Sequence, residues 1–112
     1  MSSKEKTLMY RVTTPTHTFT LPIDTGTCSE ILVSYRQKNV ALDKHYQNDT
    51  LPEGMALSGE TVVINLTQEE TKQFAKGDVY VQVRVLTTAG KAFASQKFRI
   101  SANDVLNEVI LE

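Results

Sequence analysis

The feature that most constrains this chain is a strict alternation of apolar and polar side chains. In "DVYVQVRVL", residues 78–86, every second residue from 79 to 85 is valine, and tyrosine, glutamine and arginine stand between them. Side chains of a strand alternate between its two faces, so this stretch predicts a strand with one buried and one solvent-exposed face. Shorter stretches with the same period or with apolar β-branched runs occur at 8–14, 17–23, 30–37, 40–46, 55–57, 61–66 and 91–100.

Turn signals separate these stretches at short intervals. Lys38-Asn39, Ser58-Gly59-Glu60 and the "TTAG" at 87–90 are each short enough for a hairpin. A length of 112 residues fits one domain. About seven short strands with regular turns predict an all-β, antiparallel β-sandwich over residues 8–102. Residues 1–7 are polar, and we expect them to be a flexible N-terminus.

One segment breaks the alternation. In "LTQEETKQF", residues 66–74, Thr67 and Glu70 stand three apart before a helix-compatible run, which is the spacing of a capping box. Gly77 follows as a stop signal. We predict one short helix over about 68–75, at a corner where the chain crosses between sheets, with Phe74 anchored in the core. Glu69 and Glu70 could alternatively form an acid–base pair, but capping explains them without chemistry.

Composition excludes several classes of protein. The net charge is −1 with 22% charged residues, which disfavours a nucleic-acid-binding protein. No apolar run approaches the roughly 20 residues that a membrane-spanning helix needs, and "MSSKEKTLMY" has no apolar centre that would mark a signal peptide. Cys28 is the single cysteine, so a disulfide within the chain is impossible. We expect neither nucleic acid nor membrane as a partner.

Residues that could carry catalysis are few and scattered. His17 and His45 lie on different predicted strands, without the spacing of a shared metal site. Cys28 has no base or orienting group nearby in the sequence, and no glycine-rich phosphate loop or G-x-S-x-G motif is present. We therefore predict no catalytic, cofactor-binding or metal site, and we do not expect an enzyme.

The candidate interface residues are tyrosines and a C-terminal segment. Tyr80 lies on the polar face of the valine-rich strand, and Tyr46 begins the loop region 46–57. The C-terminal tail, residues 103–112, fits either a helix or an extended segment. Unless it docks, it leaves apolar side chains exposed, which marks an interface. The interface residues predicted here are Tyr46, Tyr80, Val105, Leu106, Val109 and Ile110.

Several segments together resemble small structural proteins of phages and prophages of Gram-positive bacteria. The shared elements are a Tyr-x-Gln strand (Tyr35, Gln37), the "LTQEET…F…G" corner from Leu66 to Gly77, a Val/Gln strand, and a glycine turn into a serine-containing strand. The order of elements, over about residues 18–106, is similar to the N-terminal immunoglobulin-like domain of baseplate upper proteins. The resemblance implies an immunoglobulin-like sandwich without catalytic residues.

Two functions follow as expectations. The resemblance implies a non-catalytic structural or interaction module of a phage or prophage particle, associated with the tail or baseplate. Such a module would be part of the virion, assembled in the host bacterial cytoplasm, with other virion proteins or its own copies as partners. The alternative is a module that binds carbohydrate or the host surface, for which the absence of tryptophan is unfavourable.

Overall fold

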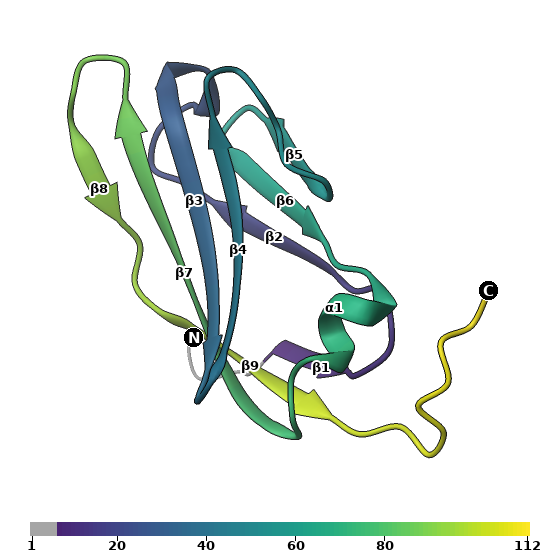
Figure 1. Cartoon of the computed structure of the whole chain (residues 1–112). Coiled ribbons are helices and arrows are strands. Elements are labelled where there is room, and N and C mark those ends of the chain that lie inside the picture. The colour runs from purple at the N-terminus through teal and green to yellow at the C-terminus, as the bar shows by residue number, and fades with distance from the viewer. Residues whose placement is uncertain (1–6) are drawn as a thin grey trace.

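The computed structural model describes residues 7–112. They form nine strands, a 3₁₀ turn and one short α-helix (Figure 1). The elements, in chain order, are β1 (Thr7–Tyr10), β2 (Thr16–Thr20), the 3₁₀ turn (Thr25–Thr27), β3 (Cys28–Gln37), β4 (Val40–Gln47), β5 (Met55–Ser58), β6 (Thr61–Asn65), α1 (Gln68–Lys72), β7 (Gly77–Thr87), β8 (Ala92–Ala94) and β9 (Phe98–Asn103).

The strands are arranged in two sheets that pack face to face. The large sheet has the order β1-β9-β7-β3-β4. β8 pairs with the second half of β7, on the same side as β9, which pairs with the first half. The small sheet has the order β2-β6-β5. Every pair is antiparallel except β1 with β9, which is parallel, with Thr7 opposite Ile100. The predicted antiparallel sandwich therefore contains one parallel pair, β1 with β9.

This strand order is that of an immunoglobulin-like sandwich. β3, β7 and β9 take the places of strands C, F and G, and β4 adds to them as strand C′ does in variable-type domains. β2, β6 and β5 take the places of strands B, E and D. The predicted fold class is confirmed, although residues 7–112 form nine strands rather than about seven.

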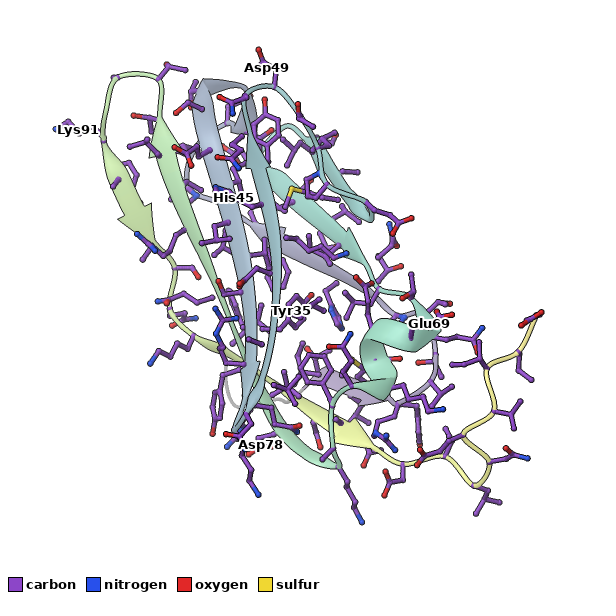
Figure 2. All side chains as sticks on the ribbon, in the orientation of Figure 1. Tyr35, His45, Asp49, Glu69, Asp78 and Lys91 are labelled. Atoms are coloured by element: carbon purple, nitrogen blue, oxygen red, sulfur yellow. The ribbon has the colours of Figure 1, made fainter. Side chains whose placement is uncertain are left out.

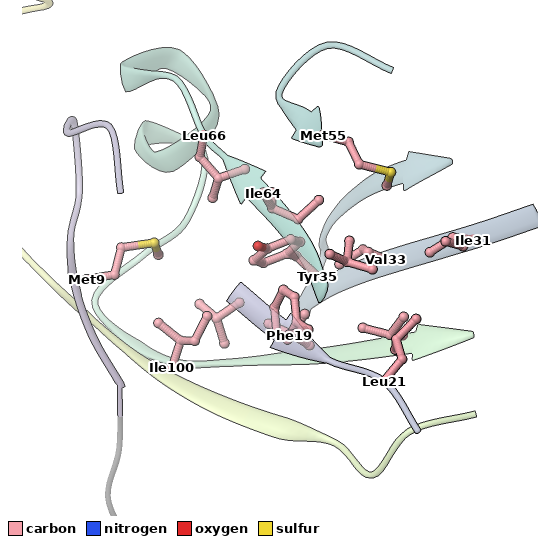
Figure 3. Close-up of a cluster of buried hydrophobic side chains, with 14 of the residues drawn as sticks. Met9, Phe19, Leu21, Ile31, Val33, Tyr35, Met55, Ile64, Leu66 and Ile100 are labelled. Carbon is pink, nitrogen blue, oxygen red and sulfur yellow. The ribbon is translucent and has the colours of Figure 1, made fainter. Parts of the chain in front are cut away.

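The alternating pattern builds the core directly. The valines of β7 face inward and are almost fully buried, together with Ile31, Val33 and Tyr35 of β3. Phe19 of β2 and Ile64 of β6 meet them from the small sheet (Figure 3). The hydrophobic side chains thus form one continuous layer between the sheets, as the sequence predicted.

A hydrogen bond between two buried aromatic side chains links the sheets at the centre of this layer. His17 Nδ1 of β2 lies 2.8 Å from the hydroxyl of Tyr35 on β3. Burial lowers the pKa of His17 and raises that of Tyr35. Antibody domains place a disulfide and a buried tryptophan in this region of the fold. In this chain the single cysteine, Cys28, is buried and unpaired. The hydrogen bond between His17 and Tyr35 occupies this region of the core.

The helical corner lies between β6 and β7, as predicted, but the helix is shorter than expected. Thr67 and Glu70 form the complete capping box, and Phe74 is buried. The helix ends at Lys72 rather than near residue 75. The side-chain amide of Gln37 bonds both the N–H and the C=O of Ala75, at 2.7 Å each, so these groups do not continue the helical ladder.

Two predicted boundaries shift by one residue. Thr7 belongs to β1 rather than to the flexible N-terminus, and the rest of that predicted segment, residues 1–6, lies outside the described residues. Asn103 ends β9, so the tail that follows the sandwich is residues 104–112. The tail, drawn in yellow, is neither helix nor strand and runs outward from the end of β9 (Figure 1).

Candidate functional site

The outer face of the large sheet carries a polar row across three strands. Tyr80 on β7 lies opposite Arg36 of β3 on one side and Arg99 of β9 on the other. Gln82 lies opposite Ser34 in the next outward-facing row. Because period-two alternation buries the valines of β7, it must also display the residues between them.

Most of these side chains, but not Arg99, line an open hollow of about 500 Å³. The lining residues are Ser34, Arg36, Tyr80, Val81, Gln82, Arg84 and Lys97. Tyr80 is 47% exposed, and Arg84 and Lys97 are also exposed. We call this surface the outer face. It combines one aromatic ring with basic and amide groups, which can contact acidic side chains or polar ligands.

Positive charge dominates the outer face. Arg36 forms an ion pair with Asp43 of β4 at 2.8 Å, and its hydrogen bond lowers the pKa of Asp43. Arg84 and Lys97 have no ion pair with any residue in the range 7–112. These basic residues lie in separate segments of the sequence. The pairing of β3, β7 and β9 brings them together on one face.

Side-chain contacts with the β8–β9 connection fix the shape of this face. Gln82 Nε2 donates to the Ser95 carbonyl at 2.9 Å, and the Val83 N–H donates to Ser95 Oγ at 3.0 Å. Residues 95–97 therefore bulge between β8 and β9, and they bring Lys97 to the hollow.

Tyr46, the other predicted interface tyrosine, is placed differently. It is half-buried on β4 and packs against the core cluster. Its hydroxyl donates to the Asp49 carboxylate at 3.3 Å, in the turn after β4. Tyr46 is absent from the lining of the outer face, so the structure does not bring the two tyrosines together.

The four predicted tail residues divide into two pairs. Leu106 and Val109 are exposed, at 109% and 62%, whereas Val105 and Ile110 are half-buried. Leu111, which was not predicted, is 75% exposed. The tail therefore displays apolar side chains to solvent while it stays attached to the domain by polar contacts.

Arg11 makes most of that attachment, and no pattern in the sequence points to this role. Its guanidinium contacts Asp104 at 3.0 Å and Glu108 at 2.6 Å, and it also donates to the carbonyls of Lys72 and Phe74 at the end of α1. The hydrogen bond with Glu108 raises the pKa of Arg11 and lowers that of Glu108. One side chain thus joins the β1–β2 connection, the helical corner and the tail.

Another ion pair lies beneath the corner. Lys44 Nζ lies 2.5 Å from Glu70 Oε2, and both side chains are largely buried. Glu70 also accepts the N–H of Thr67 at 2.9 Å. Burial acts to raise the pKa of Glu70, but the hydrogen bonds from Lys44 and Thr67 outweigh it and lower that pKa. Glu70 therefore has structural partners on both oxygens.

The residues considered for catalysis do not converge. His17 is buried against Tyr35, whereas His45 on β4 contacts Glu30 at 2.9 Å. Figure 2 shows His45 on β4, well away from Tyr35. The thiol of Cys28 is buried, and burial raises its pKa, which disfavours the thiolate. Among residues 7–112 no three His, Cys, Asp or Glu side chains are grouped to hold a metal ion.

No protein-family model matches the sequence, and no curated protein matches it significantly. A chain from a structure of T-cell specificity and activation by the bacterial superantigen toxic shock syndrome toxin-1 is similar in fold. It has a TM-score of 0.53 and 6% identity, over 88% of this chain and 92% of that one. At that identity the likeness concerns the fold alone.

Two further structures show a weaker likeness. CopC from Methylosinus trichosporium OB3b has a TM-score of 0.49 and 14% identity, over 95% of this chain and 91% of its own. The V domain of amphioxus IgVJ-C2 has a TM-score of 0.38 and 10% identity, over 85% of this chain and 97% of its own.

In the part of the chain that the structure describes, no helix is long and apolar enough to cross a membrane.

Proposed function

We propose that this chain is a non-catalytic interaction module of a phage or prophage particle, associated with its tail or baseplate. The outer face is the observation that carries the proposal. It presents an exposed tyrosine between two arginines on the large sheet, and aromatic and arginine side chains are the residues that most often anchor protein interfaces.

The sequence supports the particle context. The Tyr-x-Gln strand and the capped corner resemble small phage structural proteins, and in this chain both elements have structural roles. Gln37 holds the end of the corner, and Glu70 caps its helix. On this proposal the module joins the virion during assembly in the bacterial cytoplasm, and it contacts other virion proteins or its own copies rather than nucleic acid or membrane.

The location of the protein tests this proposal. We expect phage particles that are induced from the encoding bacterium and purified on a density gradient to contain the chain, as detected by mass spectrometry. Its abundance should follow that of tail proteins across the gradient. A chain that is abundant in the lysate yet absent from purified particles would overturn the particle role.

A carbohydrate or host-surface function is the second candidate, and one feature of the outer face favours it. Tyr80 offers a ring face beside the amide of Gln82 and the hydroxyl of Ser34, and sugars bind to such combinations. Calorimetric titration with purified cell-wall polysaccharide tests it. We expect Tyr80→Ala to abolish binding and Tyr46→Ala to leave it, because only Tyr80 lines the hollow; absence of binding by the unmodified chain would exclude the candidate.

A further inference from the structure

The small sheet has a free edge that an immunoglobulin-like fold can fill with a strand. β2 is the outer strand of the order β2-β6-β5. In constant-type domains strand A lies at this edge, beside strand B. Here β1 pairs with β9 of the other sheet instead. Among residues 7–112 no strand pairs with the outer side of β2.

The register of β2 shows which backbone groups this edge offers. Leu21 N–H donates to the Glu60 carbonyl at 2.7 Å, and Leu66 N–H donates to the Pro15 carbonyl at 3.1 Å. In an antiparallel ladder alternate residues bond the same neighbour, so the odd-numbered residues of β2 bond β6. The N–H and C=O groups of the even-numbered residues, Thr16, Thr18 and Thr20, therefore point outward from the sheet.

An open groove runs along the same edge. It measures about 580 Å³ and is lined by Thr7, Thr16, His17, Thr18, Phe19, Thr20, Phe98 and Ile100. Its apolar surface includes the rings of Phe19 and Phe98, whose centroids are 5.3 Å apart. His17 Nε2 is buried and has no hydrogen-bond partner among residues 7–112. Outward amides beside an apolar groove are what an extended segment needs in order to add as a strand.

The tail, residues 104–112, has the chemistry to occupy this groove. Its odd-numbered residues from 105 to 111 are Val, Asn, Val and Leu, without a charge, whereas the even-numbered ones include Glu108 and Glu112. When the tail is extended, the uncharged set lies on one face. Nine residues span about 30 Å, which exceeds the roughly 17 Å that the five residues of β2 occupy.

Residues 1–6 are the other segment to consider, and their chemistry fits less well. They read "MSSKEK", with three charged side chains and a single apolar one. The tail already displays Leu106, Val109 and Leu111 to solvent. The last part of the tail is held by two hydrogen bonds between Gln68 and the backbone of Leu111, at 2.8 and 2.9 Å. Neutral exposed bonds of this kind exchange readily with water. The first part of the tail must in addition release the ion pairs of Asp104 and Glu108 with Arg11.

We propose that the free edge of β2 accepts residues 104–112 of a second copy as an added strand. Val105, Val109 and Leu111 cover Phe19 and Phe98, and the tail backbone bonds the outward groups of the three threonines. The contact joins an edge on one copy to a tail on another, so it is heterologous and builds rings or chains. It uses a surface separate from the outer face and does not depend on the function proposed above.

Variants at Thr18 test the edge. Thr18 N–H points outward, so Thr18→Pro removes a donor that β6 does not use, and proline is tolerated on such edges. Thr18→Val keeps the N–H at the same position and is the matched control. In light scattering across a wide concentration range, we expect the unmodified chain and Thr18→Val to gain mass with concentration, and Thr18→Pro to remain monomeric while folded.

Variants of the tail test whether residues 104–112 supply the added strand. Mixing two variants tests whether the tail of one copy binds the β2 edge of another. A chain lacking residues 104–112 should be monomeric, as should the double variant Val109→Asp, Leu111→Asp. A mixture of Thr18→Pro, which keeps the tail, with the tail-deleted chain, which keeps the edge, should form a one-to-one complex. This outcome separates strand donation from any symmetric contact.

Several results would overturn the proposal. These are a monomer at every concentration of the unmodified chain, unchanged association after tail deletion, or no complex in the mixture when both variants are folded by circular dichroism. Removal of residues 1–6 should leave association unchanged. If that removal alone produced association, residues 1–6 would be the natural occupant of the groove and the tail would not.

Discussion

At the scale of residues, a few buried polar side chains determine how the hydrophobic layers fit together. His17 and Tyr35 bond across the two sheets, Arg11 joins three segments, and Glu70 contacts both its own cap and Lys44. Each is one polar group placed where its partners come from distant positions of the chain. Such groups are costly to bury alone, so their loss has predictable effects.

The pH dependence of stability is the first of these effects. Burial lowers the pKa of His17 below its usual 6.5, so the unfolded chain binds a proton that the folded chain resists. The free energy of unfolding is therefore unaffected by His17 protonation above pH 6.5. It decreases as the pH falls from 6.5 through the lowered pKa of the folded state, because the unfolded chain then binds the proton more tightly. We expect urea unfolding to show lower stability at pH 5.5 than at pH 7.5.

Substitution of His17 tests this cause. His17→Gln should remove most of the difference in stability between the two pH values. Equal stability of the unmodified chain at both pH values would show that the folded state accommodates the charged imidazole.

Loss of Arg11 should detach the tail. Its side chain is only 11% exposed, and the guanidinium makes charge-assisted bonds to Asp104 and Glu108. We expect Arg11→Ala to cost about 2 kcal/mol of unfolding free energy, the range for hydrogen bonds to charged groups. Hydrogen exchange of residues 104–112 should also become faster. In contrast, Asp104→Asn removes one exposed partner and should change the unfolding free energy and the exchange rate only slightly. Unchanged hydrogen exchange of the tail in Arg11→Ala would contradict this role.

At the scale of elements, the strands and the corner were predictable from local patterns, but their contacts were not. Period-two alternation predicted β2, β3 and β7, the turn at Ser58-Gly59-Glu60 predicted β5 and β6, and the capping spacing predicted α1. The early end of the helix depends on Gln37, which is distant in sequence, and so local signals extended it to residue 75. The parallel pairing of β1 with β9 likewise joins the two ends of the domain, and no local pattern specifies it.

The corner allows a graded prediction at this scale. Thr67→Ala removes one side-chain acceptor of the capping box and should cost about 1 kcal/mol. Glu70→Ala should cost about 3 kcal/mol, because it also leaves the buried Lys44 ammonium without its carboxylate. Chemical denaturation of both variants measures the difference. Equal losses would mean that Lys44 finds water or another acceptor.

At the scale of the whole molecule, the same alternation that buries the core also produces the candidate surface. Valines enter the core from β7, and the intervening Tyr80, Gln82 and Arg84 are displayed beside Arg36. Tyr80 was recognised from sequence because its own strand placed it outward. The basic neighbours were not grouped with it, because strand order brings them together. Tyr46 precedes a loop in the sequence, which predicts an exposed ring, but the side chain is partly buried and packs against the core.

The most direct test measures incorporation of charge-reversed chains into phage particles. Arg84→Glu changes the outer face, and Lys91→Glu makes the same charge change in the β7–β8 turn, where Lys91 projects from the molecule (Figure 2). Both positions are exposed, so both variants should fold. We expect purified particles to contain the Lys91→Glu chain in the same amount as the unmodified chain. The amount of the Arg84→Glu chain per particle should be at least about tenfold lower. Equal incorporation of the two variants would contradict the outer face as the contact surface.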